Sequence, residues 1–183
     1  MGWKNVKDHY RIGHFVTIKD EWDDFSRKPT GNKLLCIGSP LCHDLITVNL
    51  TTWKFKQALS GPLGGDLQRY WDELHADLDK LRALVEQPDT FEKSIVVYTY
   101  EGGDIVEKLC EEPGWPNVTH DGLMQYENTF STDRDYIIER ARRNAEAAVK
   151  LGQDGLAQME KQLAEQREWL GKASADLEKL NAL

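Results

Sequence analysis

The sequence predicts an α+β fold: a mainly antiparallel β-sheet head with one or two packed helices, followed by a long C-terminal coiled-coil helix. Short runs of β-branched and aromatic residues, separated by glycine and proline, recur through residues 1–130. Residues 131–183 are instead highly charged and repeat leucine at every seventh position. We therefore expect two domains, a globular head at 1–130 and a long helix at 131–183.

The composition is that of an ordinary globular protein. Of 183 residues, 40% are hydrophobic and 30% are charged. No apolar run approaches the ~20 residues that span a bilayer, and the first residues lack the apolar core of a secretory signal. We expect a cytoplasmic protein without membrane contact, in which Cys36, Cys42 and Cys110 are free thiols.

The charge is unevenly distributed. The net charge is −8, yet residues 131–183 are nearly neutral, with 9 Lys and Arg against 10 Asp and Glu. Residues 1–130 carry 14 against 21. An acidic head without a basic stripe argues against direct nucleic-acid binding, which needs clustered Lys and Arg. It favours a protein partner with a basic surface, although a solvated acidic surface without a partner is the simpler alternative.

The first half of the head reads as strands. Alternating or continuous apolar residues predict four of them, at residues 13–19, 34–37, 45–50 and 53–56. Residues 20–32 are charged and contain Pro29 and Gly31, which predicts a loop, and residues 38–40 predict a turn.

A helix is predicted over residues 66–87, where apolar residues recur at the spacing of an amphipathic helix. Asp66 is the expected N-cap and Pro88 the expected stop. Because Asp77 could cap a second helix, a break near Ala76 is the alternative.

Residues 95–100 and 105–110 predict a β-hairpin, since Gly102 and Gly103 between them permit the positive φ of a tight turn. A loop at 111–122 and a last strand at 123–126 should follow.

The tail carries a heptad pattern. Thr132 or Asp133 can cap a helix that begins near Arg134. Its apolar a and d positions predict a coiled-coil seam, and we expect these residues to form the oligomer interface: Val149, Leu156, Met159, Leu163, Leu170, Leu177 and Leu180. A homodimer is the expected assembly. Alternatives are packing of this helix on its own head, a turn at 152–155 that makes a hairpin, and a partner helix from another protein.

Within the predicted loop at 111–122, Pro113 and Pro116 restrict the backbone on both sides of Trp115. A rigid loop that presents tryptophan is a good anchor for a partner surface. The candidate partner-binding residues are therefore Trp115, Asn117, His120 and Asp121. The alternative is that Trp115 folds inward and covers the sheet.

No phosphate loop, dinucleotide fingerprint or metalloprotease helix is present. Cys36, Cys42 and His43, with Cys110 or His120, match no common zinc spacing, so we expect no metal and no cofactor.

Residues 2–14 (GWKNVKDHYRIGH) and 111–122 (EEPGWPNVTHDG) resemble small uncharacterised proteins encoded by bacteriophages and prophages. The similarity runs through the head, and a charged helical tail lies at the same place. That family has no assigned activity, so it supplies no functional residues. The resemblance implies a bacterial host cytoplasm and a role in modulating a host or defence protein.

The leading functional hypothesis is a non-enzymatic, oligomeric, phage-derived protein-interaction factor whose acidic head meets a host or phage protein. A small enzyme is the competing hypothesis, with a site among His9, His14, His43 and His120. A structural or assembly protein of a phage is the third.

Overall fold

The computed structural model describes residues 1–23, 25–58, 61–114, 116–126 and 128–182 and confirms the α+β class. The chain divides into two compact units, Met1–Ile137 and Ile138–Leu183. The division falls after Ile137 rather than after residue 130. Ile137 is fully buried, so the first turn of the long helix belongs to the head.

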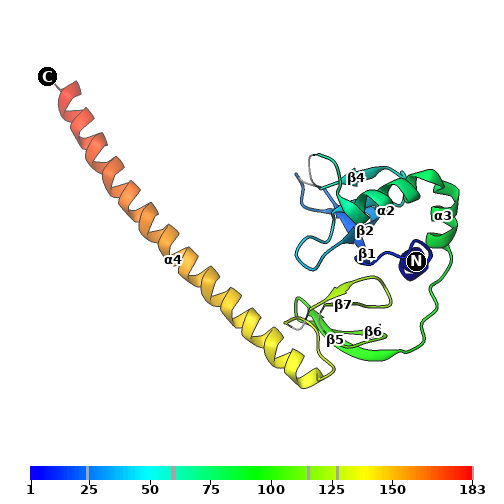
Figure 1. The fold of residues 1–183 in the computed structure, drawn as a ribbon. Helices are drawn as coiled ribbons and strands as arrows, with labels where there is room; N and C mark the ends of the chain where they lie inside the picture. The colour runs from blue at the N-terminus through cyan, green and yellow to red at the C-terminus, as the bar shows by residue number, and fades with distance from the viewer. Residues whose placement is uncertain (24, 59–60, 115, 127, 183) are drawn as a thin grey trace. The chain divides into compact units, whose positions relative to one another are not determined.

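The head is built on a four-stranded antiparallel sheet. Its strands are β1 (Phe15–Trp22), β2 (Pro29–Gly38), β3 (Ile46–Asn49) and β4 (Phe55–Gln57), in that spatial order (Figure 1). Thr17 pairs with Cys36 and Cys36 with Thr47, so these three side chains share one face of the sheet. Their neighbours Val16, Ile37 and Ile46 point to the other face and are fully buried.

The predicted loop at 20–32 is wrong over most of its length. β1 continues to Trp22 and β2 begins at Pro29, which leaves 23–28 as the connection. Charged residues are compatible with these strands because their side chains remain partly exposed: those of Lys33 and Asp20 are 43% and 48% exposed and form an ion pair of 2.7 Å. The fourth strand is also shorter than predicted, since Trp53 lies in a turn with a φ of 56°.

Three helices lie in the described part of the head, one more than expected: α1 (Trp3–His9), α2 (Gly65–Ala76) and α3 (Leu78–Glu86). The break near Ala76 is present, and the Asp77 carboxylate accepts a 2.9 Å hydrogen bond from the Lys80 backbone N–H. Gly64, not Asp66, is the N-cap of α2. α1 was not anticipated from the sequence.

The core lies between these helices and one face of the sheet. Fully buried side chains from each layer meet there, among them Val6 of α1, Leu74 of α2, Leu81 of α3, Leu35 of β2 and Val48 of β3. Burial of each such side chain contributes about 1.5–3 kcal/mol. The helices cover this face. The opposite face is partly open: Thr17 and Cys36 are buried there, whereas Lys19, Thr47 and Asn49 are half-buried.

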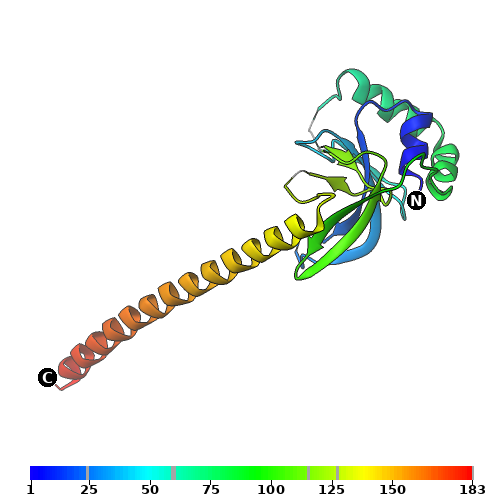
Figure 2. The same ribbon diagram turned by 90° about the horizontal axis from the view of Figure 1, so that it is seen from below.

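The second half of the head is a ribbon and a short hairpin. Strands β5 (Ile95–Glu101) and β6 (Asp104–Cys110) form the predicted hairpin, and Gly102 supplies a φ of 60° at its turn (Figure 2). The predicted last strand at 123–126 is present as β8 (Met124–Gln125), and the predicted loop at 111–122 contains a further short strand, β7 (Asn117–Val118), which pairs with it. The Ile18 N–H donates to the Gly122 carbonyl at 2.9 Å and joins this part to β1.

The second unit consists of the remainder of α4 (Arg134–Asn181), one continuous helix of 48 residues. The carboxylate of Asp133 accepts hydrogen bonds from the backbone N–H groups of Asp135 at 2.9 Å and Tyr136 at 3.1 Å, as a helix N-cap does. The alternative of a turn at 152–155 is wrong, because the helix passes through Gly152 and Gly155 without a break. At 1.5 Å per residue α4 extends about 70 Å.

Candidate functional site

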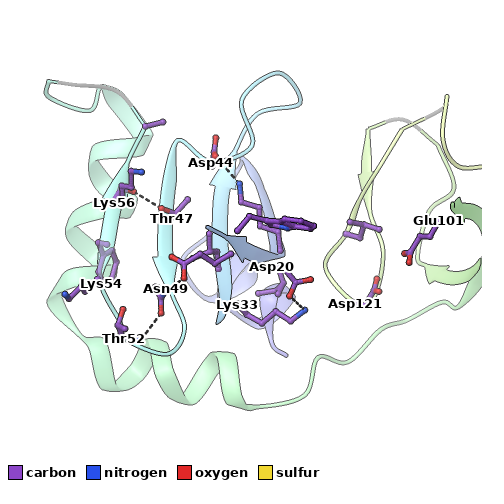
Figure 3. Close-up of a pocket in the computed structure, with 18 of the residues that line it drawn as sticks. Asp20, Lys33, Asp44, Thr47, Asn49, Thr52, Lys54, Lys56, Glu101 and Asp121 are labelled. Carbon is purple, nitrogen blue, oxygen red and sulfur yellow. Dashed lines mark hydrogen bonds and ion pairs between the residues drawn. The ribbon is translucent and has the colours of Figure 1, made fainter. Parts of the chain in front are cut away.

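A groove crosses the open face of the four-stranded sheet. Its volume is about 1180 Å³, and its lining comes from β1 to β4, from the ends of the β5–β6 ribbon, and from the loop between β7 and β8. Figure 3 shows side chains of the sheet lining one side, with Glu101 and Asp121 on the neighbouring segments. Strand alternation explains part of its polarity: Lys19, Thr47 and Asn49 lie on the face opposite the core and line the groove. Asp20 and Lys33 also line it, although the register places them on the same face as Val16 and Ile37.

Charged groups of both signs line this groove in equal numbers. Five lysines and five carboxylates contribute to it, so the acidic excess of the head lies outside the groove. Several are already paired across neighbouring segments: Lys19 with Asp44 at 3.0 Å, Lys33 with Asp20 at 2.7 Å, and Lys108 with Asp121 at 2.6 Å. The lining is therefore a set of oriented charge pairs rather than a field of one sign.

The hydrogen bond from Lys19 lowers the pKa of the Asp44 carboxyl below its usual range. Burial opposes ionisation of Asp121, but the hydrogen bonds from Lys108 and Thr119 outweigh it and lower the pKa of that carboxyl as well. Both groups are consequently charged at neutral pH.

Glu21 is held in place by three polar side chains from two strands, β2 and β3. Its Oε2 accepts hydrogen bonds from Asn32 Nδ2 at 2.8 Å, Thr30 Oγ1 at 3.0 Å and Asn49 Nδ2 at 3.2 Å. The bonds from Asn32 and Thr30 are the main causes of a lowered pKa at Glu21. A carboxylate with this many fixed donors keeps one orientation, which suits recognition of a partner.

Trp22 stands at the end of β1, lines the groove and is 60% exposed. Phe25, three residues later, is 98% exposed and is not part of the lining. Sequence reasoning missed Trp22 because it was assigned to a loop. Trp22 could have been predicted as a strand residue, because it lies two residues after Asp20 and continues the alternating pattern of residues 13–19.

The predicted partner-binding residues do not form one surface. Trp115 lies outside the described residues. Asn117 donates from Nδ2 to the Glu112 carbonyl at 2.7 Å, which stabilises its own loop. The His120 ring stacks on Phe91 with a centroid distance of 3.7 Å. Asp121 is the one described member of the set that lines the groove.

The candidate catalytic histidines are dispersed. Each packs on a different aromatic ring: His9 on Tyr10, His14 on Tyr70, His43 on Tyr126 and His120 on Phe91. None of the four belongs to the lining of the groove. The structure therefore does not bring them together as one site.

The cysteines do not form a metal centre with these histidines. The described residues contain no group of three or more His, Cys, Asp or Glu side chains placed to hold a metal ion. Cys36 is fully buried, and burial raises the pKa of its thiol to about 12, so it packs as a small apolar side chain.

The seven predicted interface residues of α4 all lie in the continuous helix and are between 52% and 66% exposed. These seven residues are called the seam below: Val149, Leu156, Met159, Leu163, Leu170, Leu177 and Leu180. Since they follow the 3–4 spacing of a heptad, they fall on one side of the helix. Leu151, at the c position, is also exposed, at 75%, but does not belong to the seam.

Comparisons with protein-family models, with curated proteins and with solved structures find no match to this chain. Among the described residues, no helix has both the length and the apolar character needed to cross a membrane.

Proposed function

We propose that this chain is a non-enzymatic, homo-oligomeric protein-interaction factor. In this proposal the seam of α4 joins two copies, and the groove on the sheet of each head receives a protein partner. The observation that carries it is the seam: a run of large apolar side chains, repeated every three or four residues, that the described residues of its own unit leave more than half exposed.

The energetics favour covering the seam. Full burial of a Leu, Val or Met side chain contributes about 1.5–3 kcal/mol, and these side chains are roughly half exposed. The seven residues of each copy, counted over two copies, then contribute on the order of 10 kcal/mol. This gain is large enough to offset much of the cost of association, about 4–15 kcal/mol.

A second copy of the chain is the occupant that its own sequence favours. Every copy carries the same seam, and knobs-into-holes packing requires the same spacing on both helices. Residues 131–183 carry 9 basic and 10 acidic residues, so two copies do not repel each other through net charge.

The head supplies the partner-binding surface in this proposal. The groove presents fixed charges of both signs, with Trp22 exposed beside them. Oriented charges provide specificity, and a tryptophan provides a large apolar contact. This composition fits a folded protein surface of mixed charge better than the purely basic partner that the net charge of the head predicts.

The wider biological role follows from the resemblance to phage and prophage proteins and stays a prediction. In a bacterial cytoplasm, an oligomeric factor of this kind would modulate a host or defence protein by binding it.

Self-association is tested with the full chain and the double variant Leu156→Glu/Leu170→Glu, analysed by sedimentation velocity. We expect the wild-type chain to sediment as a dimer and the variant as a monomer, because the substitutions place four carboxylates in the paired seam. Leu151→Glu is the matched control: it makes the same change at an exposed position outside the seam, and should remain dimeric. A wild-type monomer, or equal behaviour of the two variants, would contradict the proposal.

The groove is tested by affinity capture from bacterial lysate with wild-type protein, Trp22→Ala and Phe25→Ala, followed by quantitative mass spectrometry. A protein retained by the wild type and by Phe25→Ala, but lost with Trp22→Ala, supports the groove as the binding surface. Equal capture by all three proteins would place the partner elsewhere on the head.

A further inference from the structure

The side chains at the a positions of the heptad differ in size from those at the d positions. The a positions hold Val149 and four leucines, whereas the d positions hold a mixture that includes glycine, glutamine and alanine: Gly152, Met159, Gln166, Ala173 and Leu180. A Cβ added at Gly152 would meet nothing within 4 Å, so the small residue is not required by contacts within its own chain. The asymmetry bears on how two helices can pair.

In a parallel, in-register pair each residue faces its own copy. The d layers would then stack Gly152 on Gly152 and Ala173 on Ala173, and Gln166 on Gln166 in the centre. Two facing small residues leave an empty space between helices whose axes are 8–10 Å apart. The side chains around that space then lose van der Waals contacts. A parallel pair thus contains two poorly filled d layers, at Gly152 and Ala173, between filled a layers.

In an antiparallel pair each a residue faces a d residue. With Leu163 opposite Gln166 of the second copy, the remaining layers are Val149 with Leu180, Gly152 with Leu177, Leu156 with Ala173, and Met159 with Leu170. Every layer then contains one leucine, and each of the two smallest residues faces one. Alternation of large and small residues across facing positions is how well-packed seams fill their volume.

The flanking charges favour the same orientation independently. Reversal of one helix brings e positions together, and in this register Glu160 lies within about 3 Å along the axis of Arg167 of the second copy. The two-fold axis makes this attraction occur twice. In the parallel pair Arg167 faces Gln162 and Glu160 faces Gly155, so the flanks hold no opposite charges at these positions.

Glu160 and Arg167 do not take part in the two ion pairs formed by neighbouring residues. Lys161 pairs with Glu165 at 4.0 Å, and Lys172 pairs with Glu168 at 2.7 Å. Both pairs lie at the c and f positions, on the side of α4 that faces away from the seam.

We propose that two copies of the chain pair antiparallel through α4, with the Leu163–Gln166 layers nearest the two-fold axis. This inference rests on the proposed self-association and adds its orientation. The two Ile138 residues, where the second unit of each copy begins, are then about 80 Å apart along the axis at 1.5 Å per residue, instead of side by side. The attachment points of the two heads therefore lie at opposite ends of the helix pair.

Pulsed electron spin resonance on the full chain tests the orientation. Spin labels are attached at Lys150→Cys and Lys179→Cys, in a Cys42→Ser background, because Cys36 and Cys110 are buried. Both sites lie at outer b and c positions, so the seam is unchanged. The background protein, treated in the same way, controls for labelling of the two remaining thiols, and light scattering records the mass of each sample.

The antiparallel pair predicts a separation of about 44 Å between identical labels at either site, which is 29 residues of axial rise. A mixture of the two labelled proteins should add a distance of about 20–30 Å, because residues 150 and 179 lie at the same height on the outer sides of two helices whose axes are 8–10 Å apart. A short distance between identical labels, with a dimer mass, would overturn the orientation and leave the self-association standing. A monomer mass without inter-copy distances would overturn both.

Discussion

Charge reversal at Arg167 tests the flank of the antiparallel pair. In this arrangement Arg167→Glu replaces two attractions to Glu160 with two repulsions. Exposed ion pairs contribute about 0.2–1 kcal/mol each, and like charges cost a similar amount. Four such changes sum to about 2 kcal/mol, which is roughly a 30-fold increase in the dimer dissociation constant.

The reciprocal variant Glu160→Arg/Arg167→Glu restores opposite charges across the axis and should return the dissociation constant to within about threefold of wild type. Lys172→Glu is the matched control, because it makes the same charge change at an outer position. Sedimentation equilibrium at low salt measures all four proteins, and 1 M salt, with a Debye length of about 3 Å, should remove most of the difference. The reasoning is refuted if the double variant stays as weak as Arg167→Glu, or if Arg167→Glu matches Lys172→Glu.

Two further predictions concern the head. Asp89 accepts hydrogen bonds from two backbone N–H groups of α1, at 2.8 and 3.1 Å. Asp89→Ala should therefore lower the free energy of unfolding, measured by thermal denaturation, by about 1–2 kcal/mol. Asp79→Ala removes an exposed carboxylate as a control and should change the free energy of unfolding little; equal effects of the two variants would argue against this cap. The carboxyl pKa values of Asp44, Glu111 and Asp121 are lowered in the folded state. Their contribution to folding stability is therefore complete above the pKa values of the unfolded chain, near 4, and should be lost as the pH falls through the lower pKa values of the folded state. A melting temperature that rises on acidification from pH 5 to pH 3 would contradict this assignment.

The sequence was most informative where a local rule decides the structure. Gly102 and Gly103 between two β-rich runs predicted the hairpin, Asp77 indicated a second helix as an alternative to one, and Thr132 or Asp133 predicted the start of α4. In each case the deciding interactions lie within a few residues of one another, as in the hydrogen bond from Lys80 to Asp77.

Features that depend on distant residues could not be predicted. α1 is capped by Asp89, which lies 84 and 85 residues away from the two N–H groups that it accepts. The groove draws its lining from several strands and one loop, and the fixed position of Glu21 depends on Asn49 in another strand. The charge of residues 20–22 predicts a loop, although a strand residue can also be partly exposed, as Asp20 is.

The candidate partner-binding set shows the same limit. Its members are close in sequence, but Asn117 and His120 make contacts within the head whereas Asp121 lines the groove. The seam could be predicted as a pattern because a helix turns sequence spacing directly into a face. What covers that face depends on a second molecule.

Light scattering of the wild-type chain over a range of concentrations shows whether a second copy covers the leucine-rich face of α4. We expect a mass of twice the 21.0 kDa of one chain, which decreases toward one chain as the protein is diluted. A mass of 21.0 kDa at every concentration, including those above 100 micromolar, a concentration chosen to favour weak association, would contradict it.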